Sequence, residues 1–174
     1  MDVLLIVDMQ VGLLNEEPKH DLDGVVDRIN RLAAKVRNTS GTVIFVQHCG
    51  IKGDDFEPQT PGWAFLPELF CDPADVIVRK NLNDPFAGTD LQARLERIAP
   101  DRVLITGWAT DLCVDATVRS AVANDHNVVA VTDGHTLSDR PHLDAISVIR
   151  HHNWIWSNLI TQRSIKLASA NELL

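Results

Sequence analysis

The sequence lacks the marks of several classes of protein. No apolar run approaches the roughly 18 residues that a membrane-spanning helix needs. The first ten residues, MDVLLIVDMQ, have neither the basic region nor the small-residue cleavage site of a secretory signal. With 16 Lys and Arg against 24 Asp and Glu, the net charge of −8 argues against a surface for nucleic-acid phosphates. We therefore expect a cytoplasmic protein that binds neither nucleic acid nor a membrane.

Cysteine is also scarce, and its spacing is informative. The three cysteines are Cys49, Cys71 and Cys113, an odd number with no CxxC pair, so neither a disulfide framework nor a zinc knuckle fits. We expect free thiols, and a free cysteine is most often a buried core residue. No GxGxxG motif follows the first predicted strand, which disfavours a dinucleotide-binding protein.

Short apolar runs alternate with helical patterns along the 174 residues, and we expect one domain over residues 1–174. The runs typical of strands buried on both faces are residues 3–7, 42–47, 76–79, 103–106, 128–132 and, more weakly, 164–168. This alternation predicts an α/β fold with a parallel sheet that is covered by helices on both faces.

Four helices are predicted between these strands. Their apolar positions are Val25, Ile29, Leu32, Ala33 and Val36; Leu91, Leu95 and Ile98; Ala116, Val118, Ala121 and Val122; and Leu143, Ile146 and Ile149. Asp90 is the expected cap of the second helix, and Asp139 with Pro141 the cap and first turn of the fourth. Residues 49–69 form one long irregular segment, which predicts a loop that shapes a binding site.

Three reactive side chains follow predicted strands. Asp8 follows the first strand and Lys80 the third, while Cys113 begins the helix after the fourth. Taken singly, they are more often a turn cap, a solvated lysine and a core thiol. Together they meet at the carboxyl edge of one sheet, where ligands of parallel α/β proteins bind. A thiol, a proton acceptor and a positive charge are what nucleophilic catalysis needs, and a helix start favours the thiolate.

Several segments occur in an order typical of one family: LLIVDMQ, VIFVQH, VIVRKNLNDPFAGTDL, VLITGWATDLCVDATVRSA and VVAVTDGHT. In these segments the chain resembles the isochorismatase-like cysteine hydrolases, which include nicotinamidases and N-carbamoylsarcosine amidohydrolases. The resemblance implies a three-layer α/β/α fold, with a six-stranded parallel sheet of order 3-2-1-4-5-6. It also implies a catalytic triad of Asp8, Lys80 and Cys113, no cofactor, and assembly into a homo-oligomer, as a dimer or larger.

The same resemblance implies an oxyanion hole formed by the backbone N–H groups of Ala109 and Cys113, next to a cis peptide bond between Trp108 and Ala109. Two departures from the family also matter. His48 has no acid-x-His pair around it, so we predict no metal site there. True isochorismatases, which cleave a vinyl ether, lack the cysteine found here at position 113, so its presence favours attack on a carbonyl carbon.

Five further residues are predicted to line a substrate pocket, although each also has a structural interpretation: Gln10, His48, Trp63, Phe86 and Trp108. The segment WIWSNLI is either a contact surface between subunits or buried within one chain.

The leading hypothesis is a cysteine-dependent hydrolase that cleaves a small amide or carbamoyl-type C–N bond through a covalent acyl-enzyme. The alternatives are a hydrolase of an ester or vinyl ether at the same site, and a catalytically silent protein that binds a small molecule.

Overall fold

The computed structural model describes residues 1–14 and 17–174. Six parallel strands form one sheet in the order β3-β2-β1-β4-β5-β6. The strands are β1 (Asp2–Val7), β2 (Thr42–His48), β3 (Val76–Lys80), β4 (Arg102–Trp108), β5 (Val128–Thr136) and β6 (Ile165–Ala168). The predicted class, strand order and all six strands are confirmed, and each observed strand lies within a few residues of its predicted bounds.

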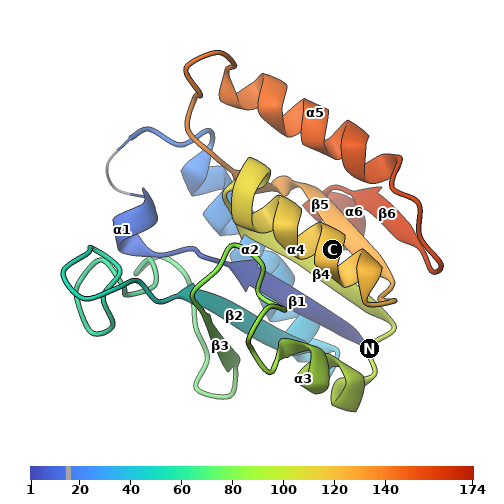
Figure 1. The fold of residues 1–174 in the computed structure, drawn as a ribbon. Helices are drawn as coiled ribbons and strands as arrows, with labels where there is room; N and C mark the ends of the chain where they lie inside the picture. Colours follow the sequence, from blue (N-terminus) through green and yellow to red (C-terminus); the bar gives the residue numbers. More distant parts are fainter. Residues whose placement is uncertain (15–16) are drawn as a thin grey trace.

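Two layers of helix cover the sheet, as Figure 1 shows. The elements between the strands are α1 (Val11–Leu14), α2 (Leu22–Asn38), α3 (Leu91–Ile98), the turn η1 (Thr110–Val114), α4 (Asp115–Ala123) and α5 (Ala145–Ser157), and α6 (Ala170–Leu173) follows β6. Residues of α3, α4 and α5 pack in one core cluster with Val3, Leu5 and Val7 of β1. Residues of α2 and α6 pack in a second cluster with Leu4 and Ile6, so β1 contributes to both halves of the core.

The fourth predicted helix begins later than expected, and this prediction was wrong in its start and its face. Asp144, not Asp139, caps α5, because its side chain accepts a hydrogen bond from the N–H of Ser147. Asp139 instead accepts a hydrogen bond from the N–H of Ala145 across the preceding loop. The α5 side chains that are buried include Ala145 and Val148, whereas Leu143 and Ile146 are exposed.

The segment WIWSNLI is buried in part, and its role as a contact surface between subunits stays a prediction. Trp156 is 0% exposed and belongs to the core, while Trp154 is 63% exposed.

The three cysteines are free, as predicted, but Cys49 and Cys71 are partly exposed and not buried core thiols. No helix within residues 1–14 and 17–174 combines the length and the apolar character needed to cross a membrane.

The packing of α2 on the sheet yields a test of the fold. Ile29 is 0% exposed at the centre of the buried face of α2, so Ile29→Ala should lower the free energy of unfolding by about 2–5 kcal/mol. Urea denaturation monitored by circular dichroism measures this. The matched control is Arg31→Ala on the exposed face of the same helix, which should change stability by less than about 0.5 kcal/mol. Equal effects of the two substitutions would contradict the observed orientation of α2.

Candidate active site

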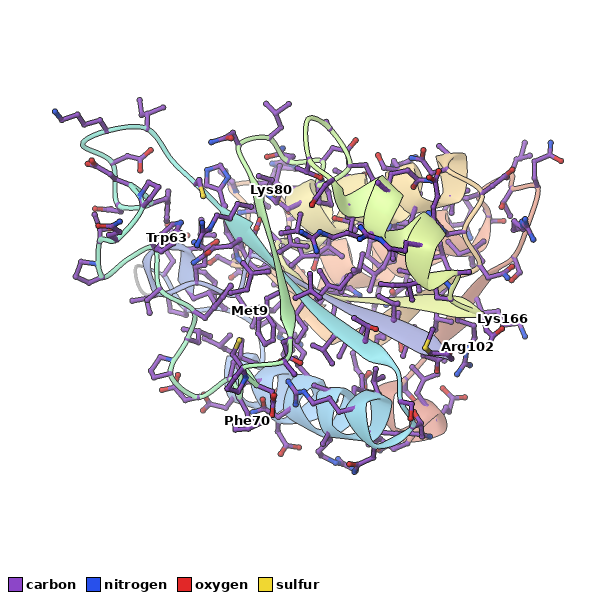
Figure 2. All side chains as sticks on the ribbon, turned by 90° about the horizontal axis from the view of Figure 1, so that it is seen from below. Met9, Trp63, Phe70, Lys80, Arg102 and Lys166 are labelled. Atoms are coloured by element: carbon purple, nitrogen blue, oxygen red, sulfur yellow. The ribbon has the colours of Figure 1, made fainter. Side chains whose placement is uncertain are left out.

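The carboxyl ends of three strands bring Asp8, Lys80 and Cys113 together. The Lys80 Nζ atom lies 2.6 Å from Asp8 Oδ2 and 3.4 Å from Cys113 Sγ, and it also donates to the carbonyl of Leu82 at 3.0 Å. Asp8 and Lys80 are fully buried, and Cys113 is 7% exposed. Figure 2 shows Lys80 at one end of the sheet, with Arg102 and Lys166 at the other. The sequence prediction that these three residues meet is therefore matched by the geometry.

Asp8 occupies a backbone turn immediately after β1. Its φ is 51°, in the left-handed region that Asp tolerates better than most residues. Its N–H donates to the carbonyl of Val46, and its own carbonyl accepts from the N–H of Gln10. These two bonds fix the carboxylate at the edge of the sheet. One of its oxygens, Oδ1, is buried without a hydrogen-bond partner among the described residues.

Gly107 allows β4 to approach the end of β1 closely. Its φ is 124°, and a Cβ atom at this position would lie 2.2 Å from the carbonyl oxygen of Val7. Only glycine fits there, because a side chain would collide with the backbone of the neighbouring strand. The segment that leaves β4 therefore starts beside Asp8.

The peptide bond between Trp108 and Ala109 is cis, as the resemblance implied. The turn η1 follows, and its only residue in the predicted triad is Cys113. The carbonyl of Ala109 accepts from the N–H groups of Leu112 and Val114, at 3.0 and 3.1 Å, but not from that of Cys113 between them. The N–H of Ala109 likewise donates to no acceptor among the described residues.

Burial dominates the electrostatics of the site. Burial raises the pKa of Cys113 to about 12; the Asp8 carboxylate acts in the same direction, and the Lys80 ammonium opposes both. Burial also raises the pKa of Asp8, against the attraction of Lys80. Lys80 was expected to favour a thiolate, but the loss of solvent around Cys113 outweighs its effect on the pKa of the thiol. Burial therefore disfavours the thiolate in the absence of substrate.

Two of the predicted pocket residues, Gln10 and Trp63, hold the loop that follows β2. Gln10 is buried, and its Nε2 atom donates to the carbonyls of His48 and Trp63 while its Oε1 accepts from the His48 N–H. The indole N–H of Trp63 contacts Cys49 Sγ at 3.4 Å, and its ring lies under the guanidinium of Arg79. These contacts orient the loop backbone at the edge of the site.

His48 lies close enough to Asp8 and Lys80 for their charges to affect its pKa. Burial lowers the pKa of His48 most, repulsion by Lys80 lowers it further, and attraction by Asp8 raises it. Its ring packs edge-on against Phe56. Within residues 1–14 and 17–174, no three His, Cys, Asp or Glu side chains form a group that could hold a metal ion.

The structure places Phe86 and Trp108 against other parts of the core. Phe86 packs on the core cluster that includes α3 and α4 and against the ring of His126. Trp108 packs on the α2 side of the sheet, where its buried indole N–H has no partner among the described residues. Their predicted role as pocket walls stays a prediction.

Sequence reasoning missed one residue beside the thiol: Asn83, whose Oδ1 lies 3.7 Å from Cys113 Sγ. Asn83 lies in NLNDPF, three residues beyond Lys80. The sequence prediction considered the residue that directly follows each predicted strand, so it did not reach Asn83. A cavity of about 610 Å³ opens elsewhere, between α2 and residues 66–68, and no member of the triad lines it.

Comparison with known proteins adds the family context. The profile of the isochorismatase domain matches residues 2–157. A streptothricin hydrolase of Streptomyces noursei is 32% identical over 148 residues, which is 84% of this chain and 54% of that protein. This chain therefore spans about half the length of that relative. The ureidoacrylate amidohydrolase RutB of Methylorubrum extorquens is 24% identical and aligns over 75% of this chain and 68% of its own length. A crystal structure of an isochorismatase family protein superposes with a TM-score of 0.86 at 28% identity, covering 97% of this chain and 98% of that one.

The opposing influences on Cys113 predict opposite effects of two substitutions. Since Asp8 raises the pKa of the thiol and Lys80 lowers it, Asp8→Asn should speed alkylation of Cys113 by iodoacetamide at pH 8.5, and Lys80→Met should slow it. With a pKa of about 12 in the unsubstituted protein, the rate should rise roughly tenfold per pH unit between pH 7 and 9.5, without a plateau.

Mass spectrometry of peptides measures these rates, and Cys71 in the same samples serves as the internal reference because it lies outside the triad. A plateau below pH 9 would show that the resting thiol is already ionised, and slower alkylation after Asp8→Asn would show that Asp8 promotes its ionisation instead of opposing it.

Proposed function

This chain belongs to the isochorismatase family, and we propose that it hydrolyses a small amide or carbamoyl-type C–N bond with Cys113 as the nucleophile. One observation carries the proposal: a single buried ammonium, Lys80 Nζ, contacts both the Asp8 carboxylate and the Cys113 sulfur. It supports a site in which a proton acceptor, a positive charge and a thiol share one solvent-poor space. In such a space each charge acts more strongly than it would in water.

The first step transfers a proton and forms a bond. The unpartnered oxygen of Asp8, Oδ1, accepts the Cys113 proton as the sulfur attacks the carbonyl carbon of the substrate. The π electrons of the carbonyl group move to its oxygen, which becomes an oxyanion. Lys80 remains protonated and keeps the second carboxylate oxygen in place, so the acceptor oxygen cannot rotate away.

Backbone donors stabilise the oxyanion. In the proposed arrangement it lies against the N–H groups of Ala109 and Cys113. The Ala109 N–H has no other acceptor among the described residues, and the Ala109 carbonyl does not accept from the Cys113 N–H. Donors of this kind are already oriented before the reaction. Their contribution therefore needs no reorganisation as the negative charge develops.

The tetrahedral adduct then collapses, and the C–N bond breaks. The proton held on Asp8 passes to the leaving nitrogen, which leaves as ammonia or an amine, and the acyl group stays on the sulfur as a thioester. A water molecule attacks this thioester while Asp8 accepts one of its protons. The sulfur leaves and regains that proton, and a carboxylic or carbamic acid is released.

The raised pKa of Asp8 favours an amide over an ester. A nitrogen leaving group must be protonated as it departs, and a carboxyl group with a raised pKa can supply that proton near neutral pH. The relative named as an amidohydrolase supports the same choice of bond. An ester remains the second candidate, because the same nucleophile and backbone donors suit it.

Substitution at the proposed nucleophile and base tests the function. Ammonia or amine release is followed on a panel of small carboxamides and ureido compounds, with matched methyl esters assayed in parallel. Cys113→Ala should abolish release, and Asp8→Asn should lower kcat by about 10²–10⁴-fold. The control Cys71→Ser, at a partly exposed thiol outside the site, should retain activity.

Mass spectrometry of Cys113 during turnover should reveal the added acyl group. Hydrolysis of the esters alone would favour the second candidate. Full activity of Cys113→Ala would refute the mechanism, and no turnover of any compound, with tight binding of one, would indicate a silent binding protein.

A further inference from the structure

A buried hydrogen bond ties the turn that carries Cys113 to a histidine on β5. Thr110, the residue after Ala109, is 0% exposed, and its hydroxyl Oγ1 lies 2.8 Å from Nδ1 of His135. His135 is 2% exposed and lies on β5, on the far side of the turn from Lys80 and Asp8. The bond therefore connects the segment that bears the two backbone donors to a part of the sheet that the mechanism does not use.

The neighbours of His135 fix the direction of this bond. Asn153 on α5 donates from Nδ2 to the carbonyl of Thr132 at 3.1 Å, so its Oδ1 is the atom that faces His135 Nε2, at 3.2 Å. An amide oxygen only accepts, and Nε2 must therefore carry the proton. Nδ1 is then the unprotonated nitrogen, and it accepts from the Thr110 hydroxyl.

Burial keeps this imidazole uncharged. It lowers the pKa of His135 to about 4; repulsion by His152 adds to this, while the Asn153 bond and Asp133 oppose it. The ring also packs edge-on against Trp156, with centroids 5.0 Å apart. His135 is therefore held as one tautomer in one orientation.

Two more contacts hold the same stretch of chain to the region of α5. Trp156 donates from its indole nitrogen to Asp115 at 2.9 Å, and Arg140 makes a two-pronged ion pair with Asp111 at 2.6 and 2.8 Å. Asp111 and Asp115 lie two residues before and after Cys113. The stretch is thus fixed from the α5 side, while the Cys113 Sγ atom contacts Lys80 Nζ.

We propose that His135 is a positioning residue, which acts through the Thr110 hydroxyl to hold the N–H groups of Ala109 and Cys113 in the orientation that receives the oxyanion. Asn153 completes the arrangement by fixing the imidazole tautomer. This inference rests on the proposed function, because it assigns the ordered turn a role in hydrolysis.

Thr110→Val tests the inference in the full-length protein, since valine keeps the shape of threonine and removes only the hydroxyl. We expect kcat on the best amide of the panel to fall about 10–100-fold with KM changed less than about twofold, because misplaced donors weaken binding of the transition state more than that of the substrate. Thr110→Ser restores the hydroxyl and should recover kcat to within about threefold.

Two further variants separate positioning from general stability. Asn153→Leu removes the acceptor that fixes the tautomer and should lower kcat in the same way, which provides a second test should Thr110→Val fold poorly. The matched control is Thr136→Val, which deletes another fully buried threonine hydroxyl, bonded to the carbonyl of His20, and should leave kcat unchanged. Equal kcat values for Thr110→Val and Thr136→Val would overturn the inference.

A readout without substrate distinguishes this inference from the proposed function. Nitrogen-15 NMR of the imidazole should show His135 protonated at Nε2 alone, and as a mixture of tautomers in Asn153→Leu. Hydrogen exchange at the Cys113 amide, relative to the Leu5 amide in the same sample, should speed up about tenfold or more in Thr110→Val but not in Thr136→Val.

If these NMR and hydrogen-exchange results are obtained but no compound is hydrolysed, the proposed function is refuted, while the hydrogen bond between Thr110 and His135 is still shown to hold the turn. Unchanged hydrogen exchange at the Cys113 amide in Thr110→Val, together with a His135 imidazole protonated at Nδ1, would refute the positioning role of His135 whether or not the protein is an enzyme.

Discussion

The contact between Lys80 and Asp8 is the interaction on which the site depends. Two opposite charges are buried side by side at the sheet edge, and removal of either partner from such a pair costs about 3–5 kcal/mol because the other charge is left without compensation. The pair is satisfied only if β1 and β3 keep their positions on either side of β2. The register of β2 and β3, with His48 opposite Lys80, is therefore part of the site as much as of the fold.

The fold and the proximity of Asp8, Lys80 and Cys113 were predictable from the sequence for related reasons. Strands buried on both faces are near-continuous apolar runs, so β1, β2 and β4 could be identified, and a parallel sheet sends their following residues to one edge. Asp8 and Cys113 were found by this rule. The start of α5 was misjudged because Asp139 and Asp144 both resemble caps and both accept from N–H groups of the first turn of α5; only the folded chain shows that the helix begins directly after Asp144.

The roles of single polar side chains were far less predictable. Gln10 was expected in the pocket, yet its amide makes three hydrogen bonds to backbone groups of His48 and Trp63. The partnership of Thr110 with His135 left no trace in the sequence, because the two residues are 25 positions apart and neither belongs to a periodic pattern. Periodicity reports which face of an element is buried, whereas a hydrogen bond between two loops or strand ends depends on angles that only the folded chain sets.

The raised pKa of Cys113 gives a physical reason for anchoring the site from two sides. A preformed thiolate would need only a positive neighbour, but a thiol with a pKa near 12 must lose its proton as it attacks. In the proposed mechanism, negative charge then moves from Asp8 through sulfur to the substrate oxygen within one step. Lys80 holds Asp8, where that path begins. The turn η1, held by the hydrogen bond between Thr110 and His135, positions the backbone donors where the path ends. Displacement of either end would lengthen the path through a medium of low polarity, where each added ångström between opposite charges is costly. The rigidity of the Thr110 turn and the burial of Lys80 are thus two requirements of the same chemistry.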